Sequence, residues 1–169
     1  MIKILITGAS GYIGSCLYFY LKKKYKVQAI DKKKNSFFKI ELCNLLNQKK
    51  IEKLLKKLKP NIVVHLAGQS LVDETISKKK YYDNNCKATK NLIHAMQKNK
   101  IKKIIYSSTA AVYKYKNTKL NENNILIPKS TYAKSKLFSE KIITKSKINY
   151  LIMRFFNACS ALDKPSVVG

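Results

Sequence analysis

The sequence predicts an α/β domain built as a doubly wound parallel sheet. Short apolar runs and amphipathic segments alternate from the first residue, and a glycine-rich turn follows the first run. Strands buried on both faces form near-continuous apolar runs, and right-handed crossovers place the intervening helices against a parallel sheet. The chain has 169 residues, of which 46% are hydrophobic, so residues 1–169 suit one domain with a sizeable core.

The first expected elements alternate between strand and helix. They are a strand over residues 2–6, a helix over 12–24, a strand over 27–31 and a short strand over 37–42. An apolar stripe at helical spacing predicts the helix, and its members are Ile13, Leu17, Tyr20 and Leu21.

Residues 49–59 carry the clearest helical pattern in the chain. Their apolar side chains follow the spacing i, i+3, i+4, i+7 at Ile51, Leu54, Leu55 and Leu58. Lysines occupy the opposite side, which we interpret as a solvated face. Pro60 ends this helix, because proline lacks the backbone N–H that a further turn requires.

The rest of the chain repeats the alternation. The expected elements are a strand over 61–66, a helix over 87–99, a strand over 102–108, a polar loop over 114–129, a helix over 131–146 and a strand over 149–155. Both helices have apolar positions that would face the sheet, at Leu92, Ala95, Met96, Ala133, Leu137 and Ile143.

A formal charge of +26 raises nucleic acid as a partner, but the kind of basic residue argues against a specific one. Among 35 basic residues only Arg154 is an arginine, and the lysines are spread along the chain. Readout of bases and phosphates favours arginine, whose planar fork makes two parallel hydrogen bonds. A basic protein recruited to polyanions is therefore kept as a third functional hypothesis, behind the two that follow below.

The composition also indicates the compartment. No apolar run reaches the length of a membrane span, and Met1 leads into a run too short for a signal-peptide core. The cysteines lack paired spacing, and with two histidines they form no metal-binding pattern; they are Cys16, Cys43, Cys86 and Cys159. We expect free thiols in a reducing, cytoplasmic compartment, with no membrane and no metal.

Three glycines lie between the first strand and the first helix, at Gly8, Gly11 and Gly14. Binding of a pyrophosphate needs close approach of the backbone and free N–H groups at the start of a helix, which glycines at these positions allow. A plain tight turn is the alternative, but the flanking strand and helix favour a dinucleotide site.

Asp31 follows Gly14 by 17 residues, at the end of the second expected strand. A carboxylate there can bind both ribose hydroxyls of NAD and repel the 2′-phosphate of NADP, so NAD is the expected cofactor. The lysines at 32–34 weaken that discrimination, and a strand-end turn residue is the alternative.

Tyr132 and Lys136 are spaced i, i+4 and share one face of the last expected helix. Lowering a tyrosine pKa from about 10 by about 3 units needs roughly 4 kcal/mol, which a nearby ammonium helps to supply. Chance is a serious alternative among 11 tyrosines and 34 lysines. However, Ser107 and Thr109 end the preceding strand, where hydroxyls face the ligand crevice of a parallel sheet.

Together these segments resemble the extended short-chain dehydrogenase/reductase family, which includes the NAD-dependent epimerases and dehydratases. The likeness is greatest to the amino-terminal half of the UDP-glucose 4-epimerases, and it spans nearly the whole chain. The matching segments are ITGASGYIGS at 6–15, Asp31, HLAG at 65–68, YYDNN at 81–85, YSSTAAVY at 106–113, STYAKSKLFSEKI at 130–142 and MRFFN at 153–157.

The resemblance implies a Rossmann-type NAD-binding domain and a set of cofactor contacts. Those contacts would come from Gly8, Gly11, Tyr12, Ile13, Gly14, Asp31, Glu41, Leu42, Leu66, Ala67, Gly68, Asn84, Ser107, Tyr132, Lys136 and Phe155. Glu41 replaces the usual aspartate beside the adenine, and Gln69 and Lys114 also depart from the family pattern.

The resemblance further implies an isomerase of nucleotide sugars. Thr109, Tyr132 and Lys136 would be catalytic, and Thr109, Tyr132 and Asn157 would contact a UDP-sugar substrate. Oxidation at C4 and return of the hydride to the other face would interconvert UDP-glucose and UDP-galactose. Dehydratases carry an acid and a base directly after the catalytic threonine, where this chain has two alanines, which favours epimerisation.

Family members have a carboxy-terminal substrate domain that these 169 residues do not contain. Two hypotheses follow. The first is a nucleotide-sugar 4-epimerase or its amino-terminal part, for which a separate chain is one source of the other half; the second is a truncated remnant that binds NAD without chemistry. Relatives often dimerise through the helices matching 87–99 and 131–146, so a homodimer is also expected from the resemblance.

Overall fold

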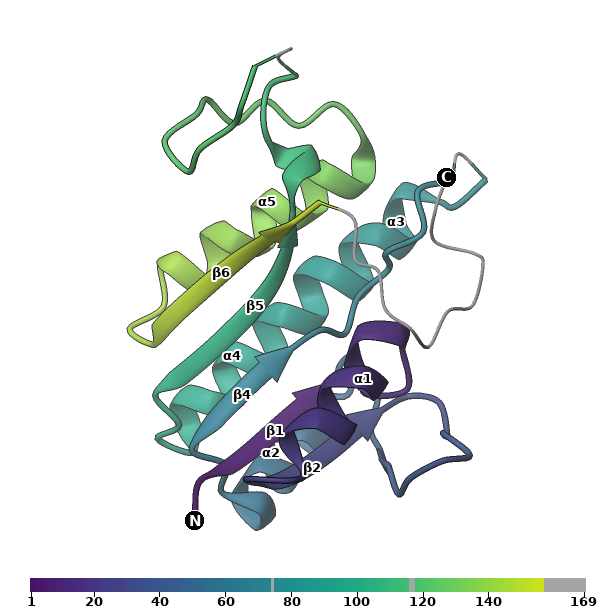
Figure 1. The fold of residues 1–169 in the computed structure, drawn as a ribbon, viewed down its shortest axis with the longest axis vertical. Coiled ribbons are helices and arrows are strands. Elements are labelled where there is room, and N and C mark those ends of the chain that lie inside the picture. Colours follow the sequence, from purple (N-terminus) through teal and green to yellow (C-terminus); the bar gives the residue numbers. More distant parts are fainter. Residues whose placement is uncertain (74, 116–117, 157–169) are drawn as a thin grey trace.

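A six-stranded parallel sheet forms the centre of the computed structural model, which describes residues 1–73, 75–115 and 118–156. The strands are β1 (Lys3–Thr7), β2 (Lys26–Asp31), β3 (Glu41–Leu42), β4 (Ile62–His65), β5 (Lys103–Thr109) and β6 (Asn149–Phe155). They lie in the order β3-β2-β1-β4-β5-β6, so the chain starts in the middle of the sheet and moves first one way and then the other (Figure 1). The predicted doubly wound fold is confirmed.

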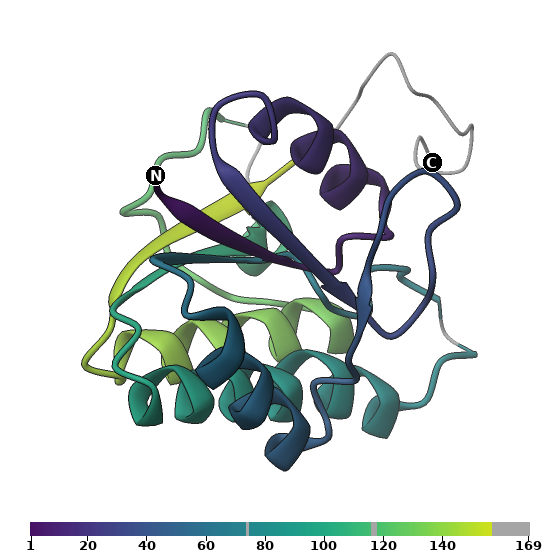
Figure 2. The same cartoon turned by 90° about the horizontal axis from the view of Figure 1, so that it is seen from below.

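Helices cover the two faces unequally. The helical elements are α1 (Tyr12–Leu21), α2 (Gln48–Leu58), α3 (Lys78–Tyr81), the π-helical η1 (Tyr82–Lys87), α4 (Ala88–Lys98), the 3₁₀ turn η2 (Ala110–Val112) and α5 (Thr131–Thr144). Figure 2 shows α1 on one face and α2, α4 and α5 on the other. The β1→β2 crossover and the β4→β5→β6 crossovers run in opposite directions, so right-handedness places their helices on opposite faces.

The two faces bury separate apolar clusters. The larger one lies between the sheet and α2, α4 and α5, and includes Leu5, Ile51, Leu55, Leu92, Met96, Ile104 and Ile143. The smaller one lies under α1 and includes Ile4, Ile6, Ala29 and Val64. Most positions expected to face inward on α2, α4 and α5 are buried, whereas Leu58 and Leu137 are only partly so. The expected α1 positions Ile13, Leu17 and Leu21 are also only partly buried.

Near α1 and β3 the structure differs from what the sequence predicts. Residues 37–40 form no strand, and only Glu41 and Leu42 pair with β2. Tyr20, expected to face inward, is 71% exposed. Tyr18 packs inward instead, with its ring stacked on Phe38 at 3.9 Å between centroids. Phe38 is thus held by an aromatic contact to α1 and not by a ladder of strand hydrogen bonds.

The helix expected over 87–99 begins nine residues earlier. Ser77 caps it by accepting a hydrogen bond from the Lys80 N–H, and α3, η1 and α4 then follow without a break. The segment is rich in lysine, asparagine and tyrosine, so it carries no apolar stripe. The π-helical turn inserts an extra residue per turn, a feature often found at functional sites.

Candidate functional site

The glycine turn after β1 is as tight as a backbone allows. Gly8 has φ +72°, and a Cβ there would lie 2.6 Å from the Ala67 nitrogen. A Cβ on Gly14 would collide with the Gly8 carbonyl oxygen and lie 2.8 Å from Ala9 Cα. The Gly11 N–H closes the turn by donating to the Gly8 carbonyl at 3.1 Å. The first turn of α1 therefore presses directly on the loop, which brings the start of a helix against the carboxyl end of β1.

Asp31 ends β2 beside this turn. Its Oδ2 accepts a hydrogen bond from the Ser10 N–H at 3.1 Å, and its Oδ1 accepts one from the Lys33 N–H at 3.1 Å. Tyr12 and Ile13 begin α1 next to it and are half-buried. The carboxylate and the glycine turn, 21 residues apart in sequence, form one surface.

The segment after β4 connects the glycine turn to α5. The Leu66 N–H donates to the Thr7 carbonyl at 3.1 Å, and the Ala67 N–H donates to Thr7 Oγ1 at 3.2 Å. A Cβ on Gly68 would lie 2.7 Å from Asn85 Oδ1 and 4.0 Å from Lys136 Nζ. Gly68 thus allows the backbone to pass between η1 and the lysine of α5.

His65 is fully buried beneath this segment. Its Nδ1 lies 2.7 Å from Thr7 Oγ1, and its Nε2 lies 2.9 Å from Thr89 Oγ1. Burial, with a smaller effect from the Lys136 charge, lowers its pKa to about 3. The imidazole is therefore neutral at physiological pH and links β1 to α4.

Asn85 extends this connection to α5. Its Oδ1 accepts from the Gln69 N–H at 2.7 Å, and its Nδ2 donates to Ser135 Oγ at 2.8 Å. The sequence indicated its neighbour Asn84, which is half-buried and accepts a hydrogen bond from Lys32 Nζ at 3.4 Å. The π-helical turn directs Asn85 inward, and no pattern in the sequence predicted that turn.

Lys136 is buried on the inner face of α5. Its Nζ donates a hydrogen bond to the Ser107 carbonyl and lies 4.4 Å from the centroid of the Tyr106 ring. Burial lowers its pKa to about 7, against an opposing effect of Glu140. The ammonium therefore loses its proton far more easily than a lysine in water.

Tyr132 lies in the first turn of the same helix. Ser130 caps that helix by accepting from the Ala133 N–H at 3.1 Å, which fixes the orientation of the first turn. The Tyr132 side chain lies close to that of Thr109 at the end of β5. Burial raises the pKa of Tyr132, and the interaction with Thr109 opposes that effect. Tyr132 and Lys136 thus both reach the carboxyl end of β5, at Thr109 and Ser107.

A largely buried ion pair joins α5 to β6, and no pattern in the sequence predicts it. Arg154 donates to both carboxylate oxygens of Glu140, from Nε at 3.1 Å and from Nη2 at 2.8 Å. The Ser108 hydroxyl also donates to Glu140, and Arg154 Nη1 donates to the Tyr113 hydroxyl at 2.9 Å. The one available signal was Arg154 itself, as the sole arginine of a lysine-rich chain.

The remaining candidates lie around the same edge of the sheet. Glu41 and Leu42 are exposed on β3, where Glu41 pairs with Lys57 at 3.3 Å. Phe155 is half-buried at the end of β6, in register with Thr109. Asn157 and Cys159 lie outside the described residues.

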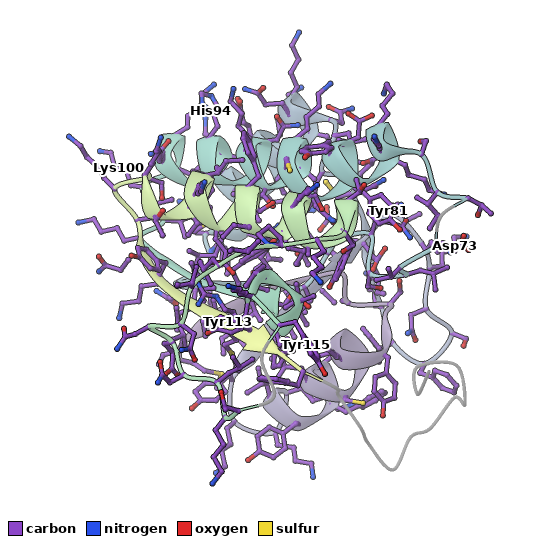
Figure 3. All side chains as sticks on the ribbon, turned by 90° about the horizontal axis from the view of Figure 1, so that it is seen from above. Asp73, Tyr81, His94, Lys100, Tyr113 and Tyr115 are labelled. Carbon is purple, nitrogen blue, oxygen red and sulfur yellow. The ribbon has the colours of Figure 1, made fainter. Side chains whose placement is uncertain are left out.

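Tyr81 and Tyr113, both labelled in Figure 3, contact residues of this site. Tyr81, at the end of α3, stacks obliquely near Tyr132 with ring centroids 6.4 Å apart, and its hydroxyl accepts from the Asp73 N–H at 3.1 Å. Tyr113 follows η2, next to β6.

Within residues 1–73, 75–115 and 118–156, no group of three or more His, Cys, Asp or Glu side chains could hold a metal ion. None of the helices in that part of the chain combines the length and hydropathy of a membrane span. Cys43 and Cys86 are buried free thiols.

Comparisons with known proteins identify the family of this chain. Residues 4–168 match the NAD dependent epimerase/dehydratase family. The UDP-glucose 4-epimerase of Lactobacillus helveticus is 31% identical over 98% of this chain. The dTDP-D-glucose 4,6-dehydratase of Dictyostelium discoideum is 34% identical over 83% of it. The chain spans about half the length of the curated relatives it matches, for example 54% of the first and 39% of the second.

Solved structures share the fold. The UDP-Glc/GlcNAc 4-epimerase of Campylobacter jejuni superposes with a TM-score of 0.83 at 32% identity, over 96% of this chain and 56% of that one. Other solved neighbours of the same fold are UDP-glucose 4-epimerases in complex with NAD. This chain is therefore similar to the amino-terminal part of such enzymes.

Proposed function

The chain belongs to the NAD-dependent epimerase/dehydratase family, and from this premise we propose that it is a nucleotide-sugar 4-epimerase or the amino-terminal part of one. Its proposed reaction interconverts UDP-glucose and UDP-galactose. The observation that carries this proposal is the meeting, at one sheet edge, of a glycine turn with its carboxylate and a helix bearing Tyr132 and Lys136.

The glycine turn fits a dinucleotide. The space that a Cβ would fill at Gly8 and Gly14 is taken by backbone, so the N–H groups at the start of α1 can approach a pyrophosphate closely. Asp31, already bonded to the Ser10 N–H, would bind the adenine ribose and favour NAD over NADP. Residues 66–68 would line the same pocket beside Asn84.

Residues of α5 and β5 would handle the proton. Tyr132 would take the proton from the sugar 4-hydroxyl, and Thr109 would hold the reacting oxygen in line with it. Lys136 would bind the nicotinamide ribose from its place on the Ser107 carbonyl, and Phe155 would lie by the nicotinamide. NAD, when bound, would supply the acceptor for the hydride that leaves C4 of the sugar. Its positive charge would also favour the phenolate form of Tyr132.

Epimerisation is preferred to dehydration because of the residues after Thr109. Elimination of water needs an acid and a base beside the sugar, and Ala110 and Ala111 of η2 offer only methyl groups. Thr109 Oγ1 accepts from the Ala111 N–H at 3.2 Å, so the hydroxyl and these methyl groups share one tight turn. This argument separates the proposal from the dehydratase of Dictyostelium discoideum, to which the chain is also similar.

An NAD-binding protein without catalysis is the second candidate. It is favoured by the glycine turn and Asp31, which fit a dinucleotide whether or not a sugar is turned over. The partners we propose with the first candidate are a UDP-sugar, a second copy of this chain, and a separate chain supplying the other half of the relatives. The free thiols are consistent with our proposal of a cytoplasmic location.

The test is to purify the 169-residue chain, measure NAD binding and assay UDP-galactose conversion, alone and with the carboxy-terminal half of the Lactobacillus helveticus epimerase. The proposal expects NAD binding, and conversion in at least one assay that Tyr132→Phe abolishes. Binding of NAD with no conversion in either assay would leave the second candidate. Absence of NAD binding would reject both.

A further inference from the structure

Arg154, the sole arginine of the chain, forms side-chain hydrogen bonds with both Glu140 of α5 and Tyr113. Arg154 Nε and Nη2 engage both oxygens of Glu140, while Nη1 donates to the Tyr113 hydroxyl. Its guanidinium carbon also lies 4.9 Å from the centroid of the Tyr113 ring. Among 35 basic residues, this is the only place where the chain uses the planar fork that lysine lacks.

The contact joins four elements at one point. Arg154 comes from β6, Glu140 from α5, Ser108 from β5 and Tyr113 from the segment after η2. The Glu140 side chain is 5% exposed and that of Arg154 is 19% exposed, so the pair is largely removed from water. A buried carboxylate requires several donors to offset its desolvation, and Glu140 receives three hydrogen bonds.

Glu140 also stands one helical turn after Lys136 on the same face of α5, four positions along the chain. The other titratable groups that face the ammonium are Cys86 of η1, His65 of β4 and Tyr106 of β5. None of these carries a negative charge at neutral pH in its ordinary state. Glu140 is the largest electrostatic influence that favours the charged lysine, ahead of Cys86.

We propose that Arg154 is a positioning residue: its forked pair with Glu140 holds α5 against β5 and β6 and so fixes where Lys136 and Tyr132 point. This inference rests on the proposed function, in which those two side chains serve the nicotinamide half of NAD. Arg154 itself touches neither the glycine turn nor Asp31, so its effect is confined to one half of the cofactor site.

The experiment measures binding of NAD and of ADP to Arg154→Lys at a temperature where the variant is folded. Lysine keeps the charge but can meet only one carboxylate oxygen at a time. We expect NAD to bind about tenfold more weakly, the loss of one hydrogen bond to a charged group, and ADP to bind within about twofold of the original chain. Glu52→Gln, which removes an exposed ion pair with Lys98, is the control and changes neither affinity.

If Arg154 supported the whole structure, Arg154→Lys would weaken the binding of NAD and of ADP equally. If the ion pair had no effect on the site, neither affinity would change. Either result in a folded variant overturns the proposal. If Arg154→Lys does not fold, Tyr113→Phe takes its place, because it removes only the acceptor of Nη1 and keeps the ring. That variant is expected to weaken NAD about threefold with ADP unchanged, and an unchanged NAD affinity contradicts the proposal.

Failure of the proposed function is distinguished by a readout that needs no ligand. In Glu140→Gln, the Cε resonance of Lys136 is expected to titrate about one pH unit lower than in the original chain, since the opposing carboxylate is lost. If the chain binds no NAD but Lys136 shifts in this way, the proposed function fails and the role of the pair in setting Lys136 stands. An unshifted Lys136 overturns that role whatever the chain binds.

Discussion

Two regions lie at the carboxyl ends of the strands: the glycine-turn region (residues 8–14 with Asp31) and the α5 region (Tyr132, Lys136 and Glu140 with the residues that they contact). They differ in the interactions that hold them together. The glycine turn with Asp31 is mostly backbone, closed by main-chain hydrogen bonds and by the absence of side chains at Gly8 and Gly14. The α5 region is made of buried polar side chains, with Lys136 and Glu140 beneath the helix. The glycine-turn region depends on close backbone packing and the α5 region on buried charges. We therefore expect the first to respond to an added methyl group and the second to a change of pH.

The glycine-turn region is expected to show the largest effect of a single methyl group. In Gly14→Ala the new Cβ meets the Gly8 carbonyl, a backbone atom that cannot turn aside, so unfolding should become easier by about 3 kcal/mol. The measurement is urea unfolding of the purified variant.

Gly11→Ala is the matched control for this prediction. Its Cβ would lie 3.3 Å from the same carbonyl oxygen, a contact that a small shift relieves, so the expected loss is below about 1 kcal/mol. Equal losses in the two variants would show that the turn is not limited by space.

The α5 region should instead respond to pH. Burial lowers the pKa of Lys136 to about 7 from 10.5, so between these values the unfolded chain binds the additional proton. Stability therefore rises with pH in this window, by about 2 kcal/mol between pH 7 and 9. Lys136→Met should remove that rise, whereas Lys141→Met, on the exposed side of α5, should keep it. A rise that persists in Lys136→Met refutes the comparison.

Asp31 tests whether the glycine-turn region also uses charge. Asp31→Asn keeps an oxygen that can accept from Ser10 but removes the negative charge. We expect NAD to bind about tenfold more weakly while the preference over NADP falls, measured by calorimetry. Asp73→Asn, in the segment before α3, is the control. An unchanged preference would mean that the carboxylate serves only the turn.

His65 connects the two regions, and it should give the smallest effect. Its pKa lies at about 3 in the folded chain and at about 6.5 in the unfolded one, so only the unfolded chain gains a proton as pH falls between them. Its contribution to stability is lost on acidification, by about 1 kcal/mol from pH 7 to 5.5. His65→Gln should flatten this part of the profile, and the exposed His94→Gln should not. Identical profiles would exclude a neutral buried imidazole.

The same difference explains what could be predicted from the sequence. The glycine turn occupies seven consecutive residues and the strands and helices follow apolar periodicity, so the fold and this half of the site were accessible. The predicted strand over 37–42 was too long, and Tyr18 was not predicted to pack inward. Both differences come from the aromatic contact between Tyr18 and Phe38, which apolar periodicity does not reveal.

The α5 region was only partly accessible, because its contacts join distant residues. Asn85 bonds Ser135 across 50 positions and Ser108 bonds Glu140 across 32. The motif of Tyr132 and Lys136 was visible, but the π-helical turn that directs Asn85 inward and the pair of Glu140 with Arg154 depend on the folded chain.

The central claim is that these two regions bind the two halves of one NAD molecule. It is tested most directly by titrating NAD and ADP into the isotope-labelled chain while following the Ser10 amide and the Lys136 Cε by NMR. The account predicts that NAD shifts both signals with one dissociation constant and that ADP shifts only Ser10. A shift of Ser10 by NAD without any response of Lys136, or no response of either, would contradict it.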